Sequence, residues 1–162
     1  MAKAALKPAP IARDNAVDGK RFASDGVMVE TAPAASRLAL RATKRGATSF
    51  QKSLGLNIPR EIGTCESKSG VTVMCLGPDE WLIVDTKKPN VSMLPKSESK
   101  ELSATDVSHR NVAFTVSGPN AADCLNAGCP RELSLPAFPK GSAARTVIGK
   151  TEVVIYRPAN DT

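Results

Sequence analysis

The sequence predicts an α+β fold, with antiparallel strands and helices packed on one side of them. Short alternating or β-branched runs, such as "SRLALRA" and "VTVMCL", are separated by turn residues, which is typical of strands. Two of these runs are joined at once by "GPD", and so short a connection favours antiparallel pairing. Only residues 47–55 and 119–128 have the composition of short helices.

The elements of the first half follow in order. Residues 36–43 alternate and predict a half-buried strand with Leu38 and Leu40 on one face. Residues 47–55 predict a short helix that ends at Gly55. Residues 70–77 and 80–85 predict two paired strands joined by a tight turn, and the polar residues 86–100 predict a loop or a poor helix.

The second half of the chain also predicts short strands separated by turns, with one helix. We expect a short strand ending near Val107, a turn over residues 108–111 and a strand over 112–118. A helix over 119–128 follows, with Pro119 in its first turn and Gly128 just past its end. After a proline-rich loop, residues 142–157 predict two strands around a turn at Gly149-Lys150.

Length and composition indicate one soluble domain. The chain has 162 residues, of which 41% are hydrophobic and 23% charged. Residues 1–25 predict a flexible basic arm, and residues 26–162 a single α+β domain. No apolar run approaches the roughly 18 residues that span a bilayer, and the first residues lack the apolar core of a signal peptide. We therefore expect a cytoplasmic protein with no membrane contact.

The positive charge is concentrated at the front of the chain. Residues 1–60 hold 11 Lys or Arg against 4 Asp or Glu, whereas residues 61–162 hold 11 against 12. The basic stretch "RATKRGA" has no aromatic residue on which a base could stack. We interpret it as a solvated or partner-facing end of a strand, and we expect no binding of nucleic acid.

The adjacent carboxylates in "GPDEW" allow two interpretations: an acid/base pair in a pocket, or the turn between two strands. A second segment, "SGPN", repeats the order strand, Gly118, Pro119 and polar residue, but ends on Asn120, which cannot titrate. This repeat favours a structural turn at Gly77, Pro78 and Asp79, whose side chain would bond the amides of the turn. Trp81 is then a core anchor, or alternatively faces a partner.

No other motif supplies a convincing catalytic site. Asp106, Ser108 and His109 lie too close in one segment to converge as a triad. The chain has no phosphate-binding loop and no dinucleotide fingerprint. The four cysteines and the single histidine do not form the paired couples of a zinc site, so we expect packing cysteines. The prediction is therefore no catalytic, cofactor-binding or metal-binding residue in this chain.

Taken together, several motifs resemble the gamma subunit of heterotetrameric sarcosine oxidase. The resemblance runs from about Ser36 to Arg157. It rests on "GPDEW", on "DVS" from Asp106 followed by Arg110, on "GP" at Gly118 and Pro119, and on "GCP" leading to "AFP". It implies a fold related to the folate-binding domain of the glycine-cleavage aminomethyltransferase. It also implies structural or interface roles for Gly77, Pro78, Asp79, Trp81, Asp106, Arg110, Gly118 and Pro119.

The resemblance also implies a function. That complex oxidatively demethylates sarcosine to glycine, forms hydrogen peroxide, and passes the one-carbon unit to tetrahydrofolate. FAD, FMN and NAD belong to its alpha and beta subunits and zinc to its delta subunit, whereas the gamma subunit has no cofactor and catalyses nothing alone. The partners implied are the alpha, beta and delta subunits, chiefly the alpha-like one.

Members of this family continue past the strand that matches "TEVVIYR", so we expect a C-terminal part to be missing here. Two alternatives stay open. One is the equivalent small subunit of a related N-methyl amino-acid dehydrogenase. The other is a stand-alone folate-dependent aminomethyltransferase-like protein, which would need a longer chain.

Overall fold

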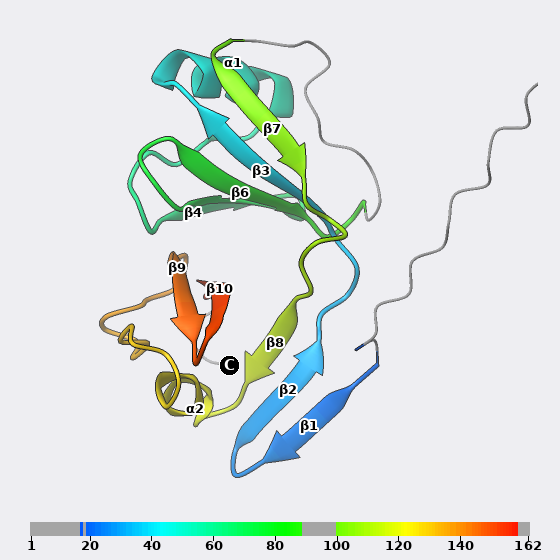
Figure 1. The fold of residues 1–162 in the computed structure, drawn as a ribbon, viewed down its shortest axis with the longest axis vertical. Helices are drawn as coiled ribbons and strands as arrows, with labels where there is room; N and C mark the ends of the chain where they lie inside the picture. The colour runs from blue at the N-terminus through cyan, green and yellow to red at the C-terminus, as the bar shows by residue number, and fades with distance from the viewer. Residues whose placement is uncertain (1–16, 18, 89–99, 159–162) are drawn as a thin grey trace, which may run out of the picture.

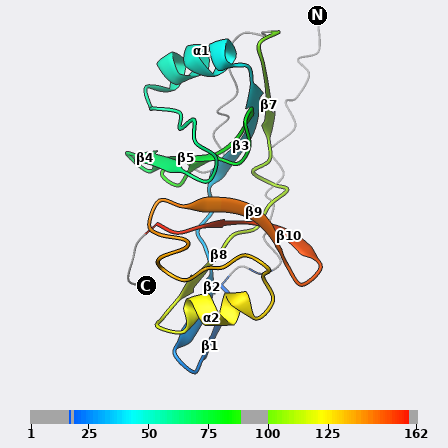
Figure 2. The same ribbon diagram turned by 90° about the vertical axis from the view of Figure 1, so that its left-hand side faces the viewer.

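The computed structural model describes residues 17, 19–88 and 100–158, and the chain folds into stacked layers of strands with one short helix at either end (Figure 1). The elements in order are β1 (Arg21–Ser24), β2 (Val27–Thr31), β3 (Ser36–Ala42), α1 (Lys44–Leu54), β4 (Cys65–Lys68), β5 (Val71–Cys75), β6 (Glu80–Asp85), β7 (Leu102–Asp106), β8 (Phe114–Ser117), α2 (Ala121–Asn126), β9 (Ala143–Ile148) and β10 (Thr151–Tyr156). Every strand pair is antiparallel, so the predicted α+β class is confirmed, but the two helices lie at opposite ends of the stack and not on one side (Figures 1 and 2).

The largest layer is a five-stranded sheet in the order β4-β5-β6-β3-β7. Its upper face carries the main core, because alternate residues of β3, β5 and β6 point toward α1. This core cluster consists of Leu38, Leu40, Ala42, Ala47, Phe50, Leu56, Ile58, Val73, Cys75, Trp81 and Ile83. The predicted strand over residues 36–43 and the pairing of β5 with β6 are both confirmed.

Helix α1 begins earlier than its composition predicts. Thr43 caps it, since its Oγ1 accepts a hydrogen bond from the amide of Gly46 at 3.1 Å, and Gly55 ends it in the left-handed conformation. The end at Gly55 is confirmed. The interpretation of "RATKRGA" as a strand end holds for Arg41 and Ala42 only, because the helix starts at Lys44.

The β9–β10 hairpin lies under the five-stranded sheet, on the face opposite α1, as the two side-on views agree (Figures 1 and 2). Ile148 pairs with Thr151 across the predicted turn at Gly149-Lys150, so this hairpin is confirmed. Its lower face packs on a second core cluster that comprises Cys129, Leu133, Phe138 and Ala144. Helix α2 adds Ala122 and Leu125 to this cluster and closes the bottom of the stack.

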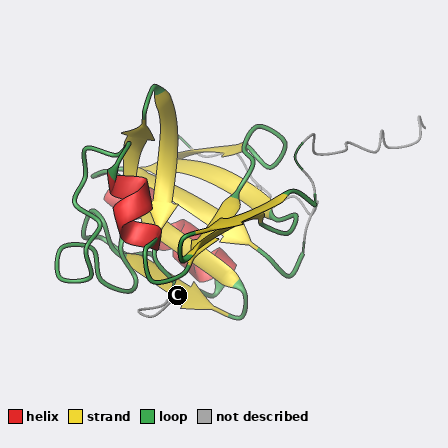
Figure 3. Ribbon diagram, turned by 90° about the horizontal axis from the view of Figure 1, so that it is seen from below, coloured by secondary structure: helices red, strands yellow, loops and turns green. Residues whose placement is uncertain are grey.

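A third, three-stranded sheet has the order β1-β2-β8. Strand β1 shows that the predicted flexible arm over residues 1–25 is wrong for Arg21–Ser24, which pair with Val27–Thr31 as a hairpin. The rest of the arm lies almost wholly outside the described residues, as do residues 89–99 of the predicted loop. Viewed along the stack, strands dominate and the two helices are short (Figure 3).

Two backbone contacts join the hairpin to the five-stranded sheet through the segment Gly63-Thr64. The amide of Gly63 donates to the carbonyl of Cys75 at 2.8 Å, and the amide of Ala143 donates to the carbonyl of Gly63 at 2.8 Å. Beside these contacts, the hydroxyl groups of Tyr156, which pairs with Ala143, and Ser67 on β4 are 3.2 Å apart. Tyr156 on one face of β10 therefore contacts β4, and Ile155 on the other face packs against the second core cluster. Among the described residues, no helix is long and apolar enough to cross a membrane.

Candidate functional site

The "GPDEW" segment forms the connection between β5 and β6. The amides of Leu76 and Gly77 both donate to the carbonyl of Glu80, at 2.9 and 3.2 Å, and these bonds close the turn. Pro78 and Asp79 are exposed at its tip, whereas Gly77 is buried. The segment is therefore a turn, but Asp79 does not bond its amides as predicted: its side chain contacts Arg41 instead.

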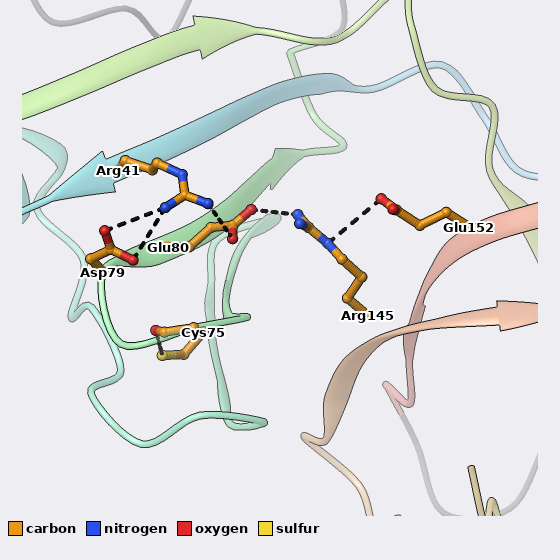
Figure 4. A network of polar contacts seen from close by, with 7 residues as sticks. Arg41, Cys75, Asp79, Glu80, Arg145 and Glu152 are labelled. Carbon is orange, nitrogen blue, oxygen red and sulfur yellow. Dashed lines mark hydrogen bonds and ion pairs between the residues drawn. The ribbon is translucent and has the colours of Figure 1, made fainter. Parts of the chain in front are cut away.

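Both carboxylates belong to a chain of ion pairs that links two layers of the fold (Figure 4). Arg41 on β3 contacts Asp79 at 3.4 Å and Glu80 at 3.1 Å. The second oxygen of Glu80 contacts Arg145 on β9, and Arg145 also contacts Glu152 on β10 at 3.8 Å. Glu80 is only 17% exposed, so this contact is less screened by solvent than an ordinary surface pair.

This geometry supports a structural role for Glu80. An acid and a base that act together need environments that push their pKa values apart. Here both carboxylates share the same arginine, and Glu80 is held between Arg41 and Arg145. The arrangement joins the five-stranded sheet to the hairpin.

Trp81 points from the turn into the main core. Its side chain is 2% exposed, and its indole nitrogen donates to the carbonyl of Pro59 at 2.7 Å. The guanidinium carbon of Arg60 lies 5.9 Å from the centre of its ring, within the range of a cation–π contact. Trp81 therefore fixes the loop after α1 against the sheet.

Asp106 and Arg110 lie at the far end of β7, where Asp106 pairs with Leu38. The amide of Ser108 donates to Asp106 at 2.9 Å, and hydrogen bonds from Ser108 lower the pKa of this carboxyl. The hydroxyl of Ser108 accepts a hydrogen bond from the amide of Arg37 at 2.8 Å. Ser108 thus ties a turn to β3, and His109 is exposed.

Gly118 and Pro119 form a third, separate location next to the β1–β2 turn. Gly118 has φ +108°, and a Cβ atom on it would lie 2.1 Å from the carbonyl oxygen of Gly26. Asn120 reaches across to the same turn, since its side-chain nitrogen donates to the carbonyl of Asp25 at 2.7 Å. Asn120 makes no side-chain cap bond to α2. A shallow depression of about 460 Å³ lies here, lined by Ala23–Met28 and Ser117–Pro119.

The predicted site residues are thus distributed over three places and do not form one pocket. Within the described ranges, no group of three or more His, Cys, Asp or Glu side chains could hold a metal ion. All four cysteines are free, and burial, with a smaller effect from Cys75, raises the pKa of Cys65 to about 12.

The sequence prediction missed Arg41, Arg145 and Glu152, which complete the ion-pair chain. A signal for the first existed: Arg41 lies on the outward face of β3, opposite Glu80 in the register of β3 with β6. Arg145 comes from a hairpin 65 residues further along the chain, and no local pattern connects it to Glu80.

Comparisons with known proteins place this fold. No family model matches the chain. Three curated proteins named "sarcosine oxidase subunit gamma" are similar: those of Corynebacterium sp. strain P-1 and Arthrobacter sp., each 25% identical over 115 residues, and that of Corynebacterium sp. strain U-96, 28% identical over 127 residues. The matches cover 69% to 75% of this chain, and 57% to 62% of the length of these relatives.

The fold itself matches a solved structure. A chain of the heterotetrameric sarcosine oxidase from Corynebacterium sp. U-96, in complex with pyrrole 2-carboxylate, superposes with a TM-score of 0.71 and 23% identity. The superposition covers 88% of this chain and 76% of that one. The predicted resemblance to the sarcosine oxidase gamma subunit is confirmed.

Proposed function

We infer that this chain is the gamma-type subunit of a heterotetrameric sarcosine oxidase. The similarity to three proteins named as that subunit supports this identity, and the matching fold is consistent with it. In this proposal the complex oxidatively demethylates sarcosine to glycine in the cytoplasm. The one-carbon unit passes to tetrahydrofolate, and hydrogen peroxide is formed.

We further propose that the role of this chain in the complex is structural. One observation carries this proposal: the best candidate acid/base pair is held by arginines, because Asp79 and Glu80 both contact Arg41 and Glu80 also contacts Arg145 on the neighbouring hairpin. FAD, FMN and NAD would then belong to partner subunits, among which the large alpha-like subunit is the main neighbour.

The experiment that tests this identity is purification of a tagged chain from its native host, followed by mass spectrometry of the proteins bound to it. We expect large flavoprotein subunits in stoichiometric amounts, and sarcosine-dependent formation of hydrogen peroxide by the purified assembly. Recovery of the chain alone, or with proteins that contain no flavin, would contradict the proposal. Oxidation of N-methylglutamate in place of sarcosine would keep the subunit role and change the substrate.

A further inference from the structure

The three-stranded sheet has one polar and one apolar face. Directly paired residues share a face, so Arg21, Glu30 and Thr115 lie together on one side, where Arg21 and Glu30 form an ion pair at 3.3 Å. The register places Phe22, Val29 and Val116 in one row on the other side. Strand alternation adds Val27 and Phe114 to that side, which we call the apolar face.

The apolar face is incompletely covered by the described part of the chain. Phe22 is 64% exposed and Phe114 is 52% exposed. Val112, two residues before Phe114, is 50% exposed. These are three of the six large hydrophobic side chains that are exposed within the described residues. No residue of β1, β2 or β8 is fully buried, and neither core cluster contains any of them. A three-stranded sheet needs a covered hydrophobic face for stability, and exposed apolar patches mark interaction sites.

The net charge of the chain selects the kind of partner. The whole chain carries a net charge of +6, and its residues 1–21 hold five Lys or Arg against two aspartates. Of these, Lys20 is exposed directly before β1, whereas Arg21 lies on the polar face of the sheet. A second copy of this chain would carry the same positive charge, and like charges oppose association. A different protein with an acidic border around an apolar centre is complementary to this surface.

We propose that the apolar face, formed by Phe22, Val27, Val29, Phe114 and Val116, is the surface on which the large partner subunit docks. This inference rests on the proposed function and adds to it the place and chemistry of the contact. The aromatic side chains supply the apolar centre, as is common at subunit interfaces. Lys20, exposed directly before β1, steers the acidic border of the partner.

The test uses the tagged chain co-expressed with the large flavoprotein subunit of the proposed complex. Phe22→Ser and Phe114→Ser should each weaken capture of that subunit about thirty-fold, the loss typical of a buried aromatic anchor. The matched control is Ile62→Ser, which removes a side chain that is 59% exposed but lies outside the sheet, and it should bind like the wild type. Lys20→Glu should slow association at low salt, and the difference should vanish at high salt.

Folding is checked separately by the fluorescence of Trp81 during urea unfolding, which these exposed substitutions should leave unchanged. Binding of both Phe variants within about three-fold of the wild type would overturn the docking face and leave the proposed function intact. A dimer of the isolated chain that Phe22→Ser dissociates would overturn the choice of partner. A wild-type chain that captures no flavoprotein subunit would refute the proposed function, and the docking face with it.

Discussion

Glu80→Gln tests whether the carboxylate in the "GPDEW" turn joins two layers or performs chemistry. The glutamine side chain has nearly the same shape but carries one acceptor oxygen and no charge, so it can keep only one of the two arginine contacts. Arg41 still has Asp79 at 3.4 Å. Arg145 is left with Glu152 at 3.8 Å, and that carboxylate is 74% exposed.

The expected loss follows from the burial of the contact. Exposed ion pairs contribute about 0.2–1 kcal/mol, whereas hydrogen bonds to charged groups contribute about 1.5–3 kcal/mol. Glu80 is 17% exposed but its arginine partners are 61% and 42% exposed, so the contact lies between these limits. We expect Glu80→Gln to lower the free energy of unfolding by about 1–2 kcal/mol, which for a chain of this size lowers Tm by roughly 2–8 °C.

Urea unfolding followed by Trp81 fluorescence measures this change, because the single tryptophan is buried next to Glu80. Asp79→Asn is the control: this carboxylate is 54% exposed, and we expect a loss below about 0.5 kcal/mol. A double-mutant cycle of Glu80→Gln with Arg145→Met should give a coupling energy of about 1 kcal/mol. Unchanged stability, together with a thousand-fold loss of turnover in the assembled complex, would refute the structural interpretation.

Three further predictions concern the close approach of two turns, the thiols and the cofactors. Gly118→Ala should destabilise the chain by more than about 2 kcal/mol in urea unfolding, because its Cβ would meet the carbonyl of Gly26. Gly141 is also at positive φ (+80°) but has nothing within 4 Å, so Gly141→Ala should cost about 1 kcal/mol. Equal losses for the two variants would contradict this. At pH 8 a chromogenic thiol reagent should label the exposed Cys124 quickly and the other three thiols slowly, and Cys124→Ser should abolish the fast phase. Because the pKa of folded Cys65 is about 12, only about 0.1% of this thiol is ionised at pH 9, so its labelling should stay far slower than that of Cys124 and should still be rising at pH 9; a rate that levels off near pH 9 would show an ordinary thiol. The isolated chain should show no flavin absorbance and no stoichiometric zinc, and either would place a cofactor site in this subunit.

Much of the fold could be predicted from local patterns. Strands β5, β6, β9 and β10 combine β-branched residues with turn signals at Gly77-Pro78 and Gly149-Lys150, so both hairpins follow from the sequence. Strands β1 and β4 gave no such signal. Each has four residues, and the sequences "RFAS" and "CESK" are largely polar because both strands lie at sheet edges.

The start of α1 could not be predicted from local helix propensity, because a tertiary contact requires a glycine in its first turn. Gly46, a poor helix former, sits in the first turn because the backbone of Glu101 passes so close that a Cβ atom would lie 2.2 Å from its carbonyl oxygen. Glu101 directly precedes β7 and lies more than fifty residues further along the chain, so local helix propensity does not reveal this constraint. The contact of Glu80 with Arg145 was missed for the same reason: Arg145 lies on β9, and only the stacking of the hairpin on the sheet brings the two together.

The stacking of the hairpin beneath the five-stranded sheet has a consequence for the order of assembly. All five strands of that sheet are present in the chain once Asp106 has been synthesised, whereas the hairpin begins only at Ala143. During synthesis the lower face of the sheet is therefore uncovered until the hairpin forms, and Glu80 lacks its contact with Arg145, which lies 65 residues further along the chain. We expect the same order when the full chain refolds, and pulsed hydrogen exchange measures it. The amides of β3 and β6 should gain protection before the amide of Ala143, and simultaneous protection would contradict this order. The hairpin then packs after the five-stranded sheet has formed, and until it does so the uncovered lower face of that sheet exposes the nascent chain to aggregation.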